Sequence, residues 1–185
     1  MKKDNPKIDL FSKFLNGFQK ETDRGAAILA ASMLDQKLKT ILADFLIECK
    51  PSRQLLEGYN APIGSFSSRQ NLAYSLGLIS DYEFKDCEIV RKIRNDFAHK
   101  FQLEFSFNES RVSSLCYNLN APTPGDKKEF KQKPRFLFVN GVTMLYVNLL
   151  YREEYVKQMR LKRPDWEDIT WSKRKLTKSS LADSR

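Results

Sequence analysis

Apolar residues recur every three or four positions along most of the chain, which is the spacing of one face of an α-helix. The clearest example runs from Arg24 to Cys49 without an internal proline. Its apolar positions are Ala27, Ala31, Leu34, Leu38, Leu42 and Phe45. We expect a long amphipathic helix here, capped at its start by Asp23 and ended by Pro51.

The same spacing predicts further helices downstream. Ser65 is suited to cap a helix that ends near Gly77, and Ser80 with Glu83 has the capping-box spacing for a helix that runs to position 99. Asn108 is expected to cap a shorter helix. A last long helix is predicted over residues 135–160, with an apolar stripe made of Phe138, Val142, Leu145 and Leu149.

The segments between and after these helices are polar. Residues 118–134 hold three prolines, a glycine and several lysines, which is typical of a linker. Residues 161–185 are polar and basic, so we expect a partly ordered tail. No stretch alternates with the period of a β-strand. The pattern therefore predicts an all-α fold, a single-domain helical bundle over residues 1–160 followed by the basic tail 161–185.

Composition narrows the class of protein. With 185 residues, 41% hydrophobic and 30% charged, the chain is able to bury a sizeable core. No apolar run approaches the ~20 residues of a membrane span, and Asp9 and Lys13 interrupt the first helix-like segment, so we expect a cytoplasmic protein without anchor or signal peptide. The three cysteines are widely spaced and there is one histidine, so neither a disulfide framework nor a metal or other cofactor is expected.

The chain is basic, with a formal net charge of +9, which favours attraction to polyanions but carries no specificity. Solvated surface charge is the ordinary explanation of such residues, and contact with nucleic acid is the functional one. The candidate contacts are Arg91, Lys92, Lys100, Lys127, Lys128, Lys131, Lys133 and Arg135.

Residues 73–80 resemble the first helix and the turn of a helix-turn-helix. A recognition helix enters the major groove through its N-terminal turns. Here those turns carry four carboxylates and one lysine, namely Asp81, Glu83, Asp86, Glu88 and Lys85. Phosphates would repel such a surface, so we do not expect direct, sequence-specific DNA reading.

The stretch from Arg94 to His99 is the one group of residues with the character of a site. Metal-free RNA cleavage needs a group that transfers a proton and a fixed cation where charge grows on the phosphate. Histidine is the residue type that most often transfers protons in enzymes, Arg94 offers a guanidinium fork, and Asn95 is suited to orient either group. The three residues are therefore candidate catalytic residues.

Geometry sets a condition on this site, because residues five apart on a straight α-helix lie about 140° apart. Either the helix ends between Arg94 and His99, or two protomers supply them across a two-fold axis, and we expect a homodimer. The structural alternative is that His99 and Lys100 bond the last helix carbonyls, while Arg94 and Asp96 form surface ion pairs.

Three blocks of the chain resemble the mannitol-repressor family of bacterial proteins. They are Asp23-Arg24-Gly25-Ala26-Ala27 to Leu38, Ala61-Pro62-Ile63-Gly64-Ser65-Phe66 to Ser80, and Ile93-Arg94-Asn95-Asp96-Phe97-Ala98-His99. The resemblance covers about residues 22–119. It implies an all-α fold and a role in regulation, transcriptional or post-transcriptional, through protein or nucleic-acid contacts.

The spacing of Arg94, Asn95 and His99 also resembles the HEPN group of helical domains. That resemblance implies a metal-independent ribonuclease that works as a dimer, with these three residues as its site. The chain departs from many such toxins in having Phe101 where they have a tyrosine. A third class is a purely structural module that binds a partner through apolar helix faces. The regulator is our first interpretation, and the ribonuclease is the alternative.

Overall fold

The computed structural model describes residues 12, 15–100 and 104–167, and all regular structure within them is helical. The all-α prediction is confirmed. After a short helical segment at residues 15–20, the elements are α2 (Asp23–Phe45), α3 (Lys50–Leu56), α4 (Phe66–Ser75), α5 (Asp81–His99), α6 (Ser110–Tyr117), the 3₁₀ turn η1 (Lys127–Phe130) and α7 (Pro134–Gln158).

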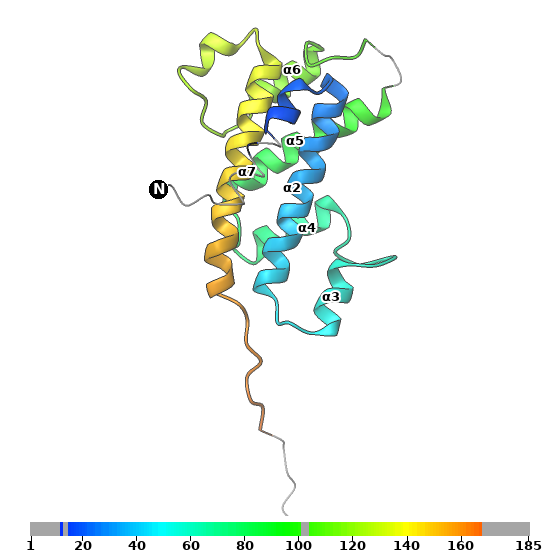
Figure 1. Ribbon diagram of the computed structural model, residues 1–185, viewed down its shortest axis with the longest axis vertical. Helices are drawn as coiled ribbons and strands as arrows, with labels where there is room; N and C mark the ends of the chain where they lie inside the picture. Colours follow the sequence, from blue (N-terminus) through cyan, green and yellow to red (C-terminus); the bar gives the residue numbers. More distant parts are fainter. Residues whose placement is uncertain (1–11, 13–14, 101–103, 168–185) are drawn as a thin grey trace, which may run out of the picture.

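Helix α2 is the centre of the bundle (Figure 1). It packs against α7 on one side and against α5 and α4 on another. Four alanines at the start of α2 are buried, which allows the neighbouring helices to approach closely, and leucines fill the layer below them. The four alanines are Ala26, Ala27, Ala30 and Ala31.

A cluster of phenylalanines fixes the C-terminal half of α5 to the bundle. The ring of Phe97 lies 5.0 Å from that of Phe107, which in turn lies 4.8 Å from that of Phe138 on α7. All three side chains are almost fully buried. Contacts of this kind hold α5 in one orientation, so the positions of the residues on its outer surface are well defined.

Two of the predicted helix starts are confirmed and two are wrong. Ser65 caps α4, and Ser80 with Glu83 forms the capping box of α5. Helix α2, however, is capped by the side chain of Thr22, which accepts a hydrogen bond from the backbone N–H of Gly25 at 3.0 Å. Position 109, and not Asn108, is the N-cap of α6.

Some predicted boundaries also differ. Helix α2 ends at Phe45, before the expected Cys49, and a separate helix, α3, starts at Lys50. Pro51 lies in the first turn of α3, where its missing N–H costs no helix hydrogen bond. Helix α7 spans 134–158 in place of 135–160. Residues 161–167 of the predicted tail follow α7 without helix, whereas 101–103 and 168–185 lie outside the described residues.

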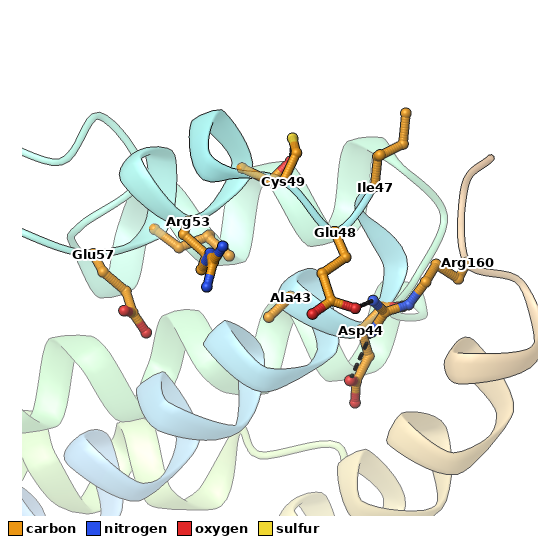
Figure 2. Close-up of a pocket in the computed structure, with 10 residues that line it drawn as sticks. Ala43, Asp44, Ile47, Glu48, Cys49, Arg53, Glu57 and Arg160 are labelled. Carbon is orange, nitrogen blue, oxygen red and sulfur yellow. Dashed lines mark hydrogen bonds and ion pairs between the residues drawn. The ribbon is translucent and has the colours of Figure 1, made fainter. Parts of the chain in front are cut away.

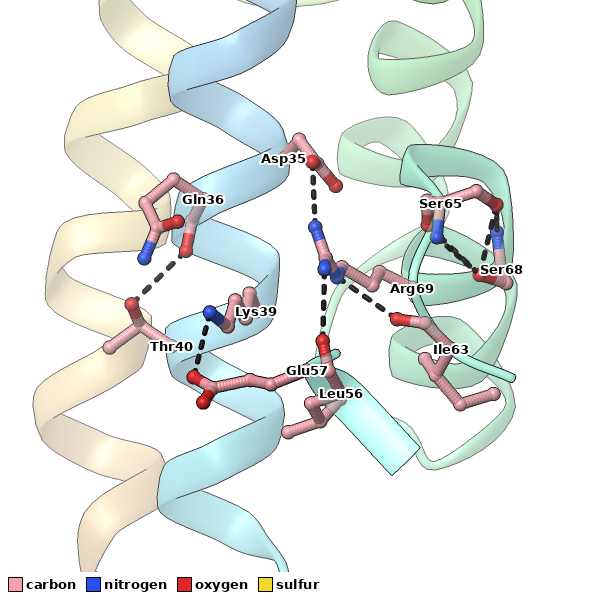
Figure 3. A network of polar contacts seen from close by, with 10 residues as sticks. All are labelled: Asp35, Gln36, Lys39, Thr40, Leu56, Glu57, Ile63, Ser65, Ser68 and Arg69. Carbon is pink, nitrogen blue, oxygen red and sulfur yellow. Dashed lines mark hydrogen bonds and ion pairs between the residues drawn. The ribbon is translucent and has the colours of Figure 1, made fainter. Parts of the chain in front are cut away.

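A buried arginine ties α3 and the loop after it to the bundle (Figure 3). Arg69 on α4 donates to the carbonyl oxygens of Leu56 at 3.1 Å and Ile63 at 3.0 Å, and its guanidinium pairs with Asp35 on α2 at 2.6 Å. The loop also contains Asn60 with a positive φ of 61°, a conformation that asparagine tolerates. One side chain therefore joins α2, α3 and α4.

Candidate functional site

The stretch from Arg94 to His99 forms the end of α5, and the helix is continuous through it. The backbone N–H of Lys100 still bonds the carbonyl of Asp96 at 3.2 Å. The helix therefore does not end between Arg94 and His99, and the first of the two conditions for a site is not met. With about 140° between them, the two side chains leave α5 in different directions. A site made of an arginine and a histidine of this motif would therefore need a second protomer.

The polar side chains of the stretch are at the surface, with different partners. Arg94 is exposed and donates to the side-chain oxygen of Asn95 at 2.9 Å. Asp96 forms an ion pair with Arg111 on α6 at 2.8 Å, as the structural alternative expected of this residue, whereas Arg94 bonds Asn95. His99 is exposed, and its imidazole has no hydrogen bond to any described residue.

The C-terminal carbonyls of α5 are satisfied by an arginine from another helix. The guanidinium of Arg24, in the first turn of α2, donates to the carbonyl oxygens of Phe97 and, at 2.7 Å, of Lys100. Helix ends need such partners, and here α2 supplies them. The expectation that the His99 side chain caps this helix is therefore not what the geometry shows. Sequence reasoning missed Arg24 because its partners lie more than 70 residues away.

Four of the candidate nucleic-acid contacts are engaged within the fold. Arg91 and Lys92 pair with Glu88 at 2.7 and 3.5 Å, and the hydrogen bond from Arg91 lowers the pKa of that carboxyl. Lys127 donates to the carbonyl of Leu119, and burial lowers its pKa. Arg135 pairs with Asp23 near the start of α2. These cations contribute to structure, so they are less available to a phosphate.

The other four candidates are available to a partner. Their side chains are exposed and make no ion pair with a described residue. They are Lys100, Lys128, Lys131 and Lys133. The last three lie in and after η1, at the end of the bundle where α6 is found and where α2 and α7 begin (Figure 1).

Two of the four acidic residues at the start of α5 do not face outward as the sequence suggested, whereas Asp81 is exposed. Glu83 is fully buried, where it accepts from the backbone N–H of Ser80 at 2.6 Å. Asp86 is also fully buried and accepts from the backbone N–H groups of Asn120 and Ala121. This surface therefore repels DNA phosphates less than the sequence suggested. Direct DNA reading is still not expected, because this part of α5 is packed against neighbouring segments and is not free to enter a groove.

The part of the chain that the structure describes contains no group of three His, Cys, Asp or Glu residues that could hold a metal ion. None of its helices is long and apolar enough to cross a membrane. The buried thiol of Cys116 has its pKa raised to about 12 by desolvation, while hydrogen bonds with Ser52 lower the pKa of Cys49.

Comparison with known proteins gives a structural match without a sequence match. No family model matches the chain, and neither does any curated protein. A solved structure that does match is the X-ray structure of the MtlR–HPr complex from Escherichia coli, with a TM-score of 0.61 and 20% identity. The match covers 75% of this chain and 97% of that chain. The chain therefore has a fold like that of MtlR, a mannitol repressor.

Proposed function

We propose that the chain is an MtlR-like regulatory protein that acts by binding a protein partner and has no catalytic activity of its own. The observation that carries this proposal is the fold, which matches nearly the whole of a chain from the MtlR–HPr complex. That structure contains a partner protein, and we transfer the mode of action, binding to an HPr-like protein, to this chain.

The geometry of α5 supports a binding role. Arg94 and His99 diverge on one continuous helix, so a single chain does not assemble them into a site. Exposed lysines that form no ion pair with a described residue lie at the same end of the bundle as α6, and they suit an acidic surface on a partner. The basic net charge of +9 would speed such an encounter.

Isothermal titration of the purified chain with HPr tests this proposal. A one-to-one complex is expected, with a dissociation constant on the order of micromolar, as for many transient regulatory contacts. An unrelated acidic protein of similar size controls for charge attraction alone. The absence of binding at about 100 µM, or equal binding of the control protein, would contradict the proposal.

A matched pair of charge reversals locates the contact. The double variant Lys128→Glu and Lys131→Glu should weaken the complex by about tenfold or more if the exposed lysines around η1 contribute. The double variant Lys50→Glu and Lys85→Glu changes the net charge equally at exposed positions elsewhere. It should leave the affinity nearly unchanged, because only charges near the interface affect binding strongly.

The second candidate function is a dimeric, metal-independent ribonuclease. It is favoured by the finding that Arg94 and His99 are exposed and that the carbonyls at the end of α5 have Arg24 as their partner. Neither side chain is needed to complete the helix, so both are available to a substrate. In a two-fold dimer, His99 of one protomer would transfer protons while Arg94 of the other stabilises the phosphate, with Asn95 orienting it.

Incubation with a mixed RNA pool in excess chelator distinguishes the two functions. A ribonuclease of this type should cleave without metal and leave cyclic or 3′ phosphates, and His99→Ala should lower the rate by about 10²- to 10⁴-fold. The regulator should leave the RNA intact. Cleavage that the wild type and His99→Ala share equally would point to a contaminant.

A further inference from the structure

A pocket lies where α2 ends, against α3 and the segment that follows α7 (Figure 2). Its volume is about 280 Å³, which suits a small metabolite. The pocket shares none of its lining residues with the Arg94–His99 stretch or with the exposed lysines around η1. It is therefore a separate feature of the molecule.

One wall of the pocket is fixed by Arg160. Its guanidinium donates to the backbone carbonyl of Asp44 at 3.1 Å and to the carboxylate of Glu48 at 3.2 Å. The backbone N–H of Leu161 adds a hydrogen bond to the carbonyl of Phe45 at 2.8 Å. These bonds hold the segment after α7 against the end of α2, so the pocket exists without a ligand to form it.

The carboxylates that line the pocket already have cationic partners. Glu57 pairs with Lys39 at 2.7 Å, and this contact lowers the pKa of its carboxyl. Glu48 pairs with Arg160, and Asp44 pairs with Arg160 at 3.4 Å as well as with Lys157. Because Arg160 and Lys157 are shared among several carboxylates, these pairs offset part of the negative charge of the lining.

Arg53 is the lining cation without such a partner. Its guanidinium extends from α3 toward the space shared with Glu48 and Glu57 (Figure 2), and it makes no hydrogen bond or ion pair with a described residue. Hydrogen bonds from Ser52 and Lys39 lower the pKa values of Cys49 and Glu57, and the positive charge of Arg53 lowers both further. The pocket thus presents one guanidinium fork that is free to bind an anion.

The rest of the lining is partly apolar and includes Ala43, Ile47 and Leu56. We propose that this pocket binds a small organic carboxylate with a short aliphatic body, whose carboxylate lies in the fork of Arg53 and whose hydrocarbon part contacts these apolar side chains. A sugar phosphate would place hydroxyl groups against the same apolar surface and lose their hydration. This inference is independent of the proposed binding to HPr.

Cys49 provides a reporter within the pocket. Its thiol contacts the hydroxyl of Ser52 at 3.2 Å, and its pKa is lowered, which favours the reactive thiolate. The other two cysteines of the chain, Cys87 and Cys116, are buried and have raised pKa values. Iodoacetamide should therefore modify Cys49 first, and a bound carboxylate should slow this reaction by covering the thiol and by opposing its ionisation.

The experiment measures the rate of Cys49 alkylation in the full chain with and without 3-methylbutanoate. A dissociation constant on the order of 1 mM is reasonable for so small a ligand. At saturation the rate should fall by about threefold or more, whereas the uncharged analogue 3-methylbutan-1-ol and inorganic phosphate should have little effect.

Arg53→Ala should remove the protection, and Arg111→Ala, at an exposed arginine outside the pocket, should retain it. Because Arg53 also affects the thiol directly, the ratio of rates with and without ligand is compared within each variant. Thermal melting confirms that each variant is folded. No protection of the wild type, protection that persists in Arg53→Ala, or equal protection by phosphate would each overturn the proposal.

Discussion

Arg24 lies far from the Arg94–His99 stretch in sequence but completes its helix. Replacing it with methionine would leave the carbonyls of Phe97 and Lys100 without these donors. Loss of charge-assisted hydrogen bonds at a partly buried site should destabilise the protein by about 1.5–3 kcal/mol, measured by urea denaturation. Arg111→Met removes an exposed ion pair and should cost less than about 0.5 kcal/mol. Equal effects of the two variants would contradict the role given to Arg24.

His99 is predicted to contribute little to stability. It is exposed and makes no hydrogen bond with a described residue, so His99→Ala should change the free energy of unfolding by less than about 0.5 kcal/mol. A residue that capped the helix and complemented its dipole would contribute about 1 kcal/mol or more. Urea denaturation of the variant distinguishes these values. A loss of more than about 1 kcal/mol in the free energy of unfolding would show that His99 does cap the helix.

Cys116 should make the protein less stable in alkali. Burial raises its pKa from 9.0 to about 12, so between these values the unfolded chain binds fewer protons than the folded one. Stability from this group is complete below pH 9 and is lost as the pH rises toward 12, by up to about 1.4 kcal/mol per pH unit. From pH 9 to 11, Cys116→Ala should therefore lose less stability than the wild type does, and Cys49→Ala should behave like the wild type. Identical pH slopes in all three proteins would contradict this assignment.

Residues with local partners were predictable, and residues with distant partners were not. Ser65 and the pair Ser80 and Glu83 bond groups three positions away, so their spacing in the sequence is sufficient to identify them. Arg24 and Asp86 bond groups 34 or more positions away, and only the folded arrangement of helices shows this. The roles of Arg94, Asn95 and His99 stay predictions, because their site requires a second chain.

At the level of elements, α5 shows what periodicity predicts and what it misses. Ile93 and Phe97 are four positions apart, which places them on one face of a helix, and both are fully buried. Glu83 and Asp86 lie on the same face, although a pattern of apolar and polar residues places carboxylates outside. They are buried because the capping box and the backbone of residues 120 and 121 satisfy them.

The loop between α3 and α4 should depend on Arg69. Arg69→Met would remove donors to the carbonyls of Leu56 and Ile63 and leave Asp35 without its ion pair. We expect a loss of about 2–4 kcal/mol and faster amide hydrogen exchange in residues 56–64. Arg53→Met, on α3 but without a hydrogen-bond partner among the described residues, is the matched control. Unchanged exchange in the Arg69 variant would show that the loop is held in another way.

At the level of the whole molecule, the arrangement of α5 leads to an expectation about assembly. If the Arg94–His99 stretch is a site, two chains must meet, and sedimentation at micromolar concentration should show a homodimer. Arg94→Ala and His99→Ala would then be inactive alone but recover part of the activity when mixed, because mixed dimers contain one intact pair. A monomer that does not change on addition of RNA would exclude the dimeric ribonuclease.

The central proposal is that the chain acts by binding a protein partner. The most direct test is an amide NMR titration of the labelled chain with unlabelled HPr. We predict saturable shifts that are confined to one contiguous surface and that include residues of the basic end around η1. An unchanged spectrum at concentrations of about 100 µM, or weak shifts scattered over all basic residues, would contradict the account.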